Sequence, residues 1–397
     1  MKVYLALIVI SALVTYVSTP AMRHLAYKVG AVTAVRDRDV HKVPTARLGG
    51  VAIFLGLAVT IAVASAIPFL QPVFEVSGAA WAVIGGAAVV CLIGVLDDIY
   101  DLDWMAKLAG QMLAAWVMAW GGVQLVTIPI AGLTIASAPV SLAVTMVSVV
   151  VAINAVNFVD GLDGLAAGMV GIGGLAFLVY TYVLARDASP GDYSSLASLI
   201  LAALVGACLG FLPHNAHPAR IFMGDSGSMV LGLVFAAAAI VVTGQVDPSV
   251  VGQRERIPAF IPILLPLVVI AMPLLDMTLA VIRRTLRGQS PWTPDAHHLH
   301  HQLIRFGHSH RWAVGVLYLW TAVLSFGTVS LVFMRMRWAA LVLIIGILAA
   351  ALVTSSPRLR GLLVAVWQGV TRPLRRLEPP GEDPRTTEIP RPTRSKK

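Results

Sequence analysis

Charged residues are scarce in this chain, and cysteine is almost absent. Asp, Glu, Lys and Arg make up 12% of the 397 residues, whereas apolar residues make up 58% and the mean hydropathy is +0.83. Soluble domains carry about 25% charged residues, so this composition excludes a soluble globular protein. The two cysteines, Cys91 and Cys208, are too few for a disulfide framework or for a zinc site built from cysteines.

The apolar residues form long blocks separated by short polar stretches. Blocks of about 20 residues are typical of membrane-spanning helices. We predict an all-α integral membrane protein with about eleven transmembrane helices in residues 1–355. A basic, Pro- and Arg-rich cytoplasmic tail follows in 356–397 and is expected to be disordered toward its end. The predicted spans cover residues 3–18, 48–67, 79–96, 104–120, 139–156, 165–185, 195–212, 226–243, 258–282, 312–334 and 338–354.

Two further features follow from the distribution of residues along the chain. Of the 29 Lys and Arg residues, 22 fall on one side of the predicted membrane and 6 on the other, and Lys107 lies near a span end. Because cytoplasmic segments carry the excess of basic residues, the N-terminus is predicted outside and the C-terminus in the cytoplasm. The net charge of +9 therefore indicates orientation and no nucleic-acid partner. A weakly alternating stretch at 123–135, with Gly132 as its turn residue, predicts a small hairpin on the outer face.

Acidic residues next to the predicted spans gather at one membrane face. Such groups are costly near a bilayer and usually functional. If the third helix continues through them, Asp97 and Asp101 share a face, and like charges so close need a cation nearby. Solvated acids at the interface are the alternative. The acids that converge on the predicted cytoplasmic face are Asp97, Asp98, Asp101, Asp103, Asp160, Asp163, Asp225 and Asp276.

The end of the fifth predicted span carries polar residues at intervals of three. On a helix this spacing places them along one polar edge of an otherwise apolar segment. Hydrogen bonding between helices would explain one asparagine but not four polar groups in register. The residues of this edge are Asn154, Asn157, Asp160 and Asp163.

The eighth predicted span opens with a carboxylate and two hydroxyl groups, those of Asp225, Ser226 and Ser228. The N-terminus of a helix favours phosphate, because its N–H groups and dipole attract negative charge. An ordinary N-cap by Asp225 or Ser226 is the alternative.

The predicted cytoplasmic loop before the tenth span is rich in histidine. His297 and His301 are four residues apart, as zinc ligands on a helix can be, but no Glu lies between them as in an H-E-x-x-H motif. Neighbouring arginines favour an anion-binding loop instead, since imidazole and guanidinium groups bind phosphate oxygens. Its candidate residues are His297, His298, His300, His301 and Arg305.

Together these residues suit one kind of chemistry. Carboxylates without cysteine favour a hard cation, Mg²⁺ or alternatively Mn²⁺. Basic and histidine-rich loops on the same face indicate a phosphate-bearing substrate, and phosphoryl transfer needs this combination of metal and cations. A site at the membrane boundary implies that one reactant is dissolved in lipid.

Five motifs, in order along nearly the whole chain, carry a family resemblance. The chain resembles the polyprenyl-phosphate N-acetylhexosamine-1-phosphate transferases, of the glycosyltransferase family 4 type. This resemblance implies transfer of a sugar 1-phosphate from a UDP-sugar to a membrane polyprenyl phosphate, undecaprenyl or decaprenyl, with release of UMP and with Mg²⁺. The motifs are His41-Lys-Val-Pro-Thr-Ala-Arg-Leu-Gly-Gly, Asp97-Asp98, Asn157-Phe-Val-Asp-Gly-Leu-Asp-Gly-Leu-Ala, Gly224-Asp-Ser-Gly-Ser and His297-His-Leu-His-His.

Two positions bear on the sugar. The peptidoglycan branch, which uses UDP-muramoyl-pentapeptide, typically has Lys four residues after the first Asp of the pair and a longer His-rich stretch. Here Asp101 stands at the first position, and Gln302 and Leu303 follow His301. Both departures favour the UDP-N-acetylglucosamine branch, with UDP-muramoyl-pentapeptide as the alternative donor.

The resemblance also implies residue roles. Asp97 would accept a proton from the polyprenyl phosphate or orient it, and Asp98 would support placement of the metal or the phosphate. Asp225 matches the metal ligand of the family, with Asp98 as a second ligand. Lys42 and Arg47 would bind the lipid phosphate. The nucleotide side would comprise Asn154, Asn157, Asp160 and Asp163, and the two acids among them are catalytic candidates. His297 is a further catalytic candidate and would bind the diphosphate. It would do so together with His298, His300, His301 and Arg305.

The expected enzyme is a multi-pass protein of the bacterial plasma membrane that forms the first lipid-linked intermediate of a cell-envelope polysaccharide, with a homodimer as one expected assembly. Its nucleophile is already anionic, which favours direct attack over a covalent aspartyl intermediate. The alternative from another class is a secondary transporter of an anionic metabolite. Transporter sites lie near the midplane of the bilayer, often in repeated, broken helices, and this sequence has charge-free span centres and no visible repeat.

Overall fold

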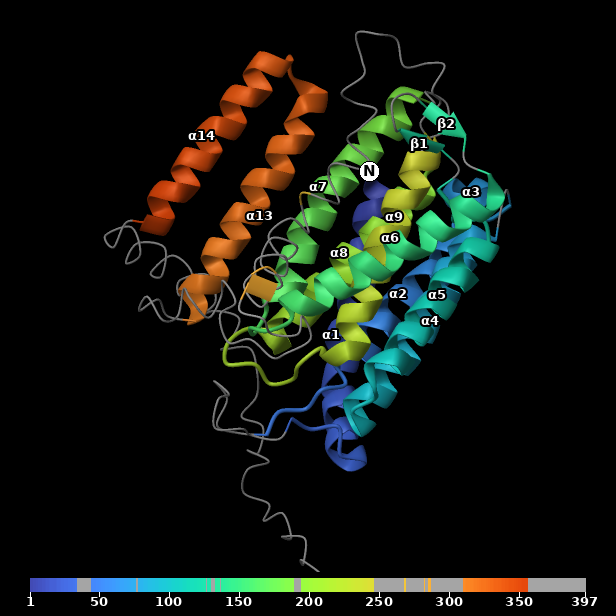
Figure 1. Cartoon of the computed structure of the whole chain (residues 1–397), viewed down its shortest axis with the longest axis vertical. Coiled ribbons are helices and arrows are strands. Elements are labelled where there is room, and N and C mark those ends of the chain that lie inside the picture. Colours follow the sequence, from blue (N-terminus) through green and yellow to red (C-terminus); the bar gives the residue numbers. More distant parts are fainter. Residues whose placement is uncertain are drawn as a thin grey trace, which may run out of the picture. The chain divides into compact units, whose positions relative to one another are not determined.

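The computed structural model describes residues 1–33, 44–75, 78–125, 127–129, 133–135, 137–188, 194–245 and 310–355, and the single positions 268, 282, 285 and 286. The chain divides into a unit of residues Met1–Ala351 and a second unit, Leu352–Lys397. Within the described residues the first unit is nearly all helical (Figure 1). Its elements are α1 (Lys2–Val29), α2 (Gly49–Ser65), η1 (Pro68–Leu70), α3 (Gln71–Glu75), α4 (Ala79–Tyr100), α5 (Trp104–Trp120), β1 (Thr127–Pro129), β2 (Leu133–Ile135), α6 (Ala138–Val159), α7 (Leu165–Ala188), α8 (Leu196–Asn215), α9 (Gly224–Gln245), α13 (His310–Phe333) and α14 (Met336–Ser355), the last of which ends in the second unit.

The predicted helical membrane protein is confirmed. Helices occupy ten of the eleven predicted spans, and the range 258–282 lies outside the described residues except at positions 268 and 282. In the described part, eight helices are long and apolar enough to cross a membrane. A ninth results if α2 and the η1–α3 segment, bent by 94°, form one span. The predicted tail at 356–397 lies outside the described residues.

The predicted strand pair is also confirmed, and its position on the outer face stays a prediction. Strands β1 and β2 pair antiparallel, with Thr127 opposite Ile135 and Pro129 opposite Leu133. The proposed turn residue, Gly132, lies outside the described residues. The pair follows α5 and precedes α6, so it connects the ends of two helices that pack against each other.

Helices α8 and α9 form the core of the first unit. Both are apolar on all sides, and almost every residue of their most apolar windows is buried. A helix with this pattern is stable only when other helices surround it. Accordingly α8 packs against α1, α2 and α7, and α9 packs against α4 and α6. The first turn of α9, which carries Asp225, therefore lies among neighbouring helices.

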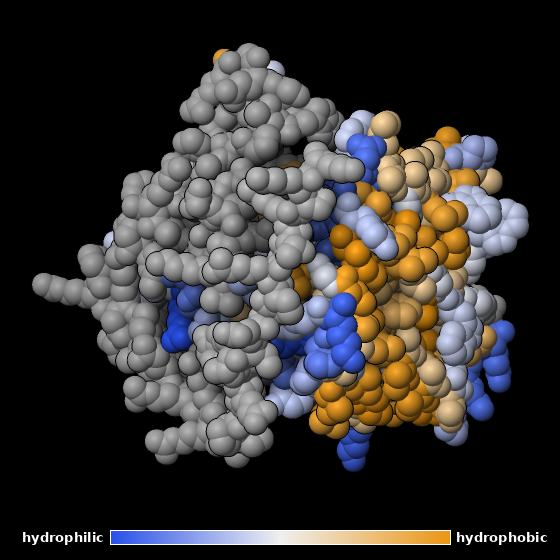
Figure 2. All heavy atoms as spheres, turned by 90° about the horizontal axis from the view of Figure 1, so that it is seen from below, coloured by the Kyte–Doolittle hydropathy of each residue, from blue (hydrophilic) through white to orange (hydrophobic). Residues whose placement is uncertain are grey.

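Apolar side chains also cover parts of the outer surface. On α1, Leu13 and Val17 are 58% and 71% exposed, and on α14, Leu348 is 63% exposed. Large exposed apolar surfaces are unusual on a soluble protein but suit contact with lipid. Figure 2 shows hydrophobic residues in a broad expanse beside hydrophilic ones. These surfaces agree with a membrane location.

Glycines allow α2 and α4 to approach the start of α9 closely. A Cβ atom on Gly50 would lie 2.0 Å from the backbone nitrogen of Gly227. One on Gly94 would lie 2.3 Å from the Cα atom of Ser226. Helices in membranes associate largely through such small residues, because close backbone approach improves van der Waals packing. The spacing between α4 and α9 is therefore set at the turn that carries Asp225.

We predict that Gly94→Ala destabilises the protein by about 1–3 kcal/mol, the usual cost of overpacking a tight interface. The melting temperature in detergent micelles, compared with that of the wild type, measures this loss. Gly315→Ala in α13 is the matched control, since a Cβ atom there meets nothing within 4 Å. That variant is expected to melt at or above the wild-type temperature. A Gly94→Ala protein as stable as the wild type would contradict the packing at α9.

Candidate active site

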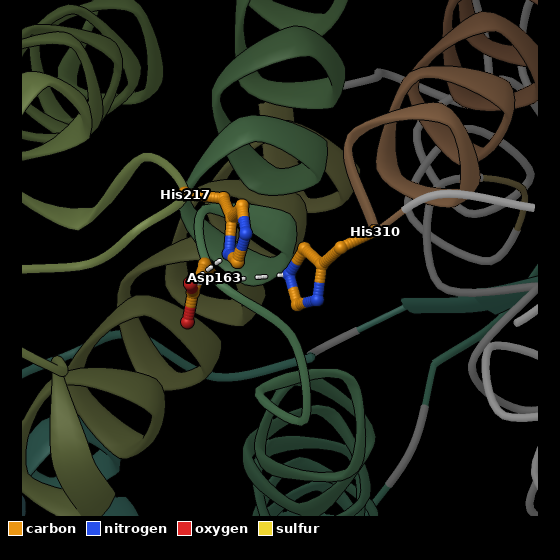
Figure 3. Close-up of side chains that lie close together, drawn as sticks. All are labelled: Asp163, His217 and His310. Atoms are coloured by element: carbon orange, nitrogen blue, oxygen red, sulfur yellow. Dashed lines mark hydrogen bonds and ion pairs between the residues drawn. The ribbon is translucent and has the colours of Figure 1, made fainter. Parts of the chain in front are cut away.

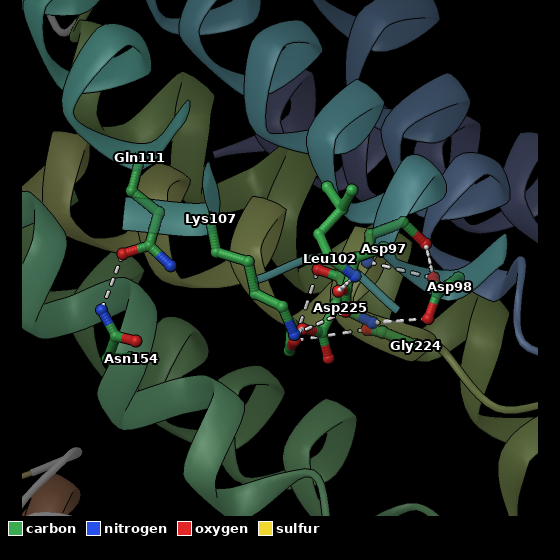
Figure 4. A network of polar contacts seen from close by, with 10 residues as sticks. Asp97, Asp98, Leu102, Lys107, Gln111, Asn154, Gly224 and Asp225 are labelled. Carbon is green, nitrogen blue, oxygen red and sulfur yellow. Dashed lines mark hydrogen bonds and ion pairs between the residues drawn. The ribbon is translucent and has the colours of Figure 1, made fainter. Parts of the chain in front are cut away.

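Two clusters of polar side chains lie where helices α4, α6 and α9 begin or end. One contains Asp163, His217 and His310 (Figure 3). The other surrounds Lys107 and contains three of the predicted acidic residues, Asp97, Asp98 and Asp225 (Figure 4). The Lys107 cluster is built from the C-terminal end of α4, the first half of α5 and the N-terminal end of α9.

Lys107 joins two carboxylates from different helices. Its Nζ atom lies 2.7 Å from Asp97 Oδ2 and 3.1 Å from Asp225 Oδ2. The Asp97 and Asp225 side chains also contact each other directly. Two carboxylates this close repel unless a positive charge lies between them, and the Lys107 ammonium supplies that charge. The closely spaced acids are expected to need a cation nearby, and Lys107 provides part of that positive charge.

Asp98 makes different contacts from those of its neighbour Asp97. Its carboxylate accepts hydrogen bonds from the backbone N–H of Asp225 (3.1 Å), from that of Ser226 (3.3 Å) and from the Ser226 hydroxyl (3.0 Å). These are N–H groups of the first turn of α9, which have no partner within their own helix. A negative charge there also interacts favourably with the helix dipole. Asp98 thus caps α9 from α4 and holds the Asp225 backbone in place.

This contact explains the glycine that precedes Asp225. Gly224 has a φ of +69°, a conformation that side-chain-bearing residues rarely adopt. A Cβ atom at this position would lie 2.3 Å from Asp98 Oδ2 and 2.3 Å from the Arg47 carbonyl oxygen. Only glycine therefore lets the chain enter α9 with Asp98 against the helix end.

The phosphate site predicted at the N-terminus of α9 is wrong in one respect. The backbone N–H groups and serine hydroxyls expected to bind phosphate already have partners. Asp98 occupies the first N–H groups. Both serines are buried, and the Ser228 hydroxyl donates to the Gly224 carbonyl. The alternative, an N-cap by Asp225 or Ser226, is also wrong, because Asp98 of α4 caps this helix.

The expected helical continuation through Asp101 is also wrong. Helix α4 ends at Tyr100, and Asp101 has a φ of 54° in the left-handed region. The side chain of Asp101 is exposed, whereas Asp97 Oδ1 accepts a hydrogen bond from Leu102 N at 2.8 Å. Asp103 caps the next helix by accepting from Met105 N. Only the first two of the four acids in this motif reach the cluster, because the chain turns after Tyr100.

Helix α6 contributes the other polar side of the site. The Asn154 amide donates to Gln111 Oε1 at 2.7 Å, which joins α6 to α5 (Figure 4). The Asn157 side chain lies within hydrogen-bonding reach of the Asp225 carboxylate. Asp160 follows directly after the end of α6. The predicted polar edge therefore faces the Lys107 cluster as far as Asp160.

The charged residues of the acidic cluster act on the pKa of Asp160. Removal from solvent, together with the negative charges of Asp225 and Asp98, raises the pKa of its carboxyl group to about 8, while the charge of Arg47 opposes the rise. Arg47, a predicted ligand of the lipid phosphate, thus lies close enough to act on this acid. A carboxyl group with such a pKa can hold or release a proton near neutral pH.

Asp163, the last residue of the predicted edge, belongs to the other cluster. Its Oδ2 atom lies 2.7 Å from His217 Nδ1 and accepts a hydrogen bond from Ala219 N at 3.1 Å. The side chain of Asp163 lies in a different cluster from the one that Asp160 faces, because the chain turns through residues 161–164 before α7 begins.

Sequence reasoning missed several residues of these clusters. Lys107 is not among the predicted site residues, although a lone charge in an apolar helix is a usable signal. The partners Gln111, His217 and His310 carried no such signal. The predicted residues that lie outside the described part of the chain are Lys42, Asp276, His297, His298, His300, His301 and Arg305.

The Lys107 cluster suits a divalent cation and phosphate groups. Asp97 and Asp225 offer carboxylate oxygens that converge on one positive charge, and hard cations such as Mg²⁺ prefer such ligands. Lys107 and Arg47 add positive charge for anionic substrates. The two cysteines are both buried.

Comparison with known proteins agrees with this chemistry. The sequence profile of glycosyl transferase family 4 matches residues 80–243, which run from α4 to α9. A decaprenyl-phosphate N-acetylglucosaminephosphotransferase of Mycobacterium tuberculosis is 42% identical over 88% of each chain. One of Mycolicibacterium smegmatis is 43% identical over 88% of this chain and 87% of its own. A probable undecaprenyl-phosphate N-acetylglucosaminyl 1-phosphate transferase of Bacillus subtilis is 31% identical over 81% of this chain and 83% of its own.

Proposed function

The chain belongs to glycosyl transferase family 4, and on that basis we propose that it transfers N-acetylglucosamine 1-phosphate from UDP-N-acetylglucosamine to a polyprenyl phosphate. The product is polyprenyl-diphosphate-N-acetylglucosamine, and UMP is released. The single observation that carries this proposal is the convergence of Asp97 and Asp225 on Lys107 at the ends of their helices. The protein is a multi-pass protein of the bacterial plasma membrane, so its lipid acceptor can reach these helix ends from within the bilayer.

The proposed reaction joins two phosphates directly. An oxygen of the polyprenyl phosphate attacks the phosphorus that bears the sugar, a new P–O–P bond forms, and the bond from this phosphorus to UMP breaks. Asp97 orients the attacking phosphate. Since the attacking oxygen is already anionic, no covalent aspartyl intermediate is required. Catalysis then depends mainly on positioning and on neutralising charge, as in other phosphoryl transfers.

We propose that Asp225 and Asp97 hold a Mg²⁺ ion, with Mn²⁺ as the alternative. Their carboxylate oxygens are hard ligands and already share one cation, the Lys107 ammonium. Such an ion supplies charge stabilisation for the phosphate oxygens. Asp98 is predicted from the sequence as the second metal ligand, but it is a positioning residue in this scheme, because hydrogen bonds from α9 engage both its oxygens. Asn157 steadies Asp225, and Asp160 lies on the nucleotide side.

The acceptor and the orientation belong to the same proposal. We favour decaprenyl phosphate, because the relatives that are 42% and 43% identical are named for it. We place the site at the cytoplasmic face, which the predicted charge asymmetry of the loops supports. A transporter is disfavoured because the acids of the described cluster lie at helix ends, whereas transporter sites lie near the midplane.

We predict that the purified protein transfers label from radiolabelled UDP-N-acetylglucosamine to decaprenyl phosphate in the presence of Mg²⁺ and releases one UMP per product. Parallel reactions contain UDP-muramoyl-pentapeptide as donor and undecaprenyl phosphate as acceptor. The label that enters the lipid phase identifies the donor and the acceptor. Transfer from the pentapeptide donor alone, or no transfer from either donor, would overturn the proposal.

A further inference from the structure

Asp163, His217 and His310 come from three separate segments of the chain. Asp163 lies in the turn before α7, His217 in the connection between α8 and α9, and His310 is the first residue of α13. His217 Nδ1 and His310 Nε2 lie 2.7 and 4.0 Å from the same oxygen, Asp163 Oδ2 (Figure 3). The three ligand atoms all lie within 4.8 Å of one another.

These separations are close to those between the ligand atoms around a coordinated metal ion. With metal–ligand distances of about 2.0–2.1 Å, neighbouring ligand atoms of a tetrahedral zinc site lie about 3.3 Å apart. The observed 2.7 and 4.0 Å fall on either side of this value. All three ligand atoms lie within 4.8 Å of one another, so movements of the side chains alone would bring both imidazoles and the carboxylate to coordinating distance.

The residue types indicate which ion would bind. Two imidazoles and one carboxylate suit Zn²⁺ and similar transition metals, whereas Mg²⁺ prefers oxygen ligands alone. The Asp163 side chain is only 1% exposed, and the two imidazoles are stacked, with ring centroids 4.3 Å apart. A buried carboxylate needs positive charge nearby, which a divalent ion would supply without protonation of both histidines.

Hydrogen bonds around the cluster hold its three segments in place. Ala219 N donates to Asp163 Oδ2 at 3.1 Å, and the Arg311 guanidinium donates to the His217 carbonyl at 3.2 Å. Next to Asp163, Gly164 N donates to Asn215 Oδ1, and the Tyr318 hydroxyl donates to the Gly164 carbonyl. Outer contacts of this kind orient metal ligands in proteins.

We propose that Asp163, His217 and His310 bind one transition-metal ion of the Zn²⁺ class, separate from the magnesium site proposed at Asp225. The ion ties the turn after α6 and the segment before α9 to the start of α13. It is structural, since the chemistry of the proposed transfer needs no ligand of this type. The proposal does not depend on the identity of the sugar or lipid substrate.

The experiment measures metal binding by the full-length protein in detergent micelles. After removal of metals with a chelator, Co²⁺ is added as a spectroscopic substitute for Zn²⁺. We expect one Co²⁺ per chain with visible absorption typical of nitrogen and oxygen ligands, displaced by equimolar Zn²⁺ but not by a large excess of Mg²⁺. His217→Ala, His310→Gln and Asp163→Asn are each expected to weaken binding at least tenfold. His24→Ala, which removes an exposed histidine of α1, is expected to leave binding unchanged.

Three results would overturn the proposal. The first is the absence of any tightly bound Co²⁺ or Zn²⁺ in the wild-type protein. The second is binding that survives all three site variants but is lost in His298→Ala or His301→Ala, which would assign the ion to the histidine-rich loop. The third is displacement of Co²⁺ by Mg²⁺ at similar concentration. Melting temperatures of the metal-free variants show whether each is folded, and the wild-type result stands without them. Because the readout is binding, a failed transferase assay would leave this test intact.

Discussion

Asp225→Asn is expected to lower the release of UMP by about 10³-fold or more. The substitution removes the negative charge that the proposed Mg²⁺ ion needs, while the backbone N–H of residue 225 can still donate to Asp98. The fold should therefore survive. A UMP-release assay at saturating UDP-N-acetylglucosamine and Mg²⁺ gives the change in rate, and the melting temperature in micelles reports folding.

The matched control is Asp101→Asn, the same chemical change in a neighbouring acid. Asp101 is exposed and has a left-handed backbone conformation, which asparagine tolerates well. We expect its activity to stay within about twofold of the wild type, since an exposed charge contributes little. Equal activity of the Asp225→Asn and wild-type proteins would remove Asp225 from the proposed mechanism.

Lys107→Met is expected to reduce transfer by about 100-fold, the usual effect of removing one charged group that stabilises a transition state. Methionine keeps most of the length of the side chain but leaves Asp97 and Asp225 without their shared ammonium group. The two carboxylates are then free to attract an added cation more strongly. We therefore expect the Mg²⁺ concentration at half-maximal activity to fall while the maximal rate also falls.

This combination separates an electrostatic role from a merely structural one. A lysine that only supported packing would change stability and leave the Mg²⁺ dependence unaltered. Lys28→Met, at the exposed end of α1, is the control for loss of a lysine. If Lys107→Met transfers sugar phosphate within threefold of the wild-type rate at every Mg²⁺ concentration, the assigned role of Lys107 is wrong.

The helices could be predicted from the sequence because the bilayer demands long apolar runs. Their ends could not, since apolar length measures the part of a helix that contacts lipid. Helix α1 continues to Val29, well past the predicted end at residue 18, through a polar stretch that includes Arg23 and His24. Helix α4 likewise extends from the predicted 96 to Tyr100, which places both Asp97 and Asp98 within its last turn.

The acids of the site could be predicted, but their partners could not. Successive residues of a helix point about 100° apart, so Asp97 and Asp98 meet different neighbours. Which of them faces α9 depends on how α4 packs, and that packing is set by glycines whose contacts lie far away in the sequence. Lys107 and Asp225 are 118 residues apart, and no local pattern links them.

The cap that Asp98 places on α9 has a mechanical consequence. Asp97 and Asp98 are consecutive in α4, and the backbone held by Asp98 includes that of Asp225, so the cap links the two helix ends that carry the carboxylates of the proposed metal site. These helix ends stay together as long as the cap is intact. Lys107 belongs to another helix, α5, and its side chain is long and flexible. Of Asp97, Asp225 and Lys107, it is therefore the residue whose charged group can move away. We therefore expect an arriving phosphate group or metal ion to displace the Lys107 ammonium group while the ends of α4 and α9 stay in place.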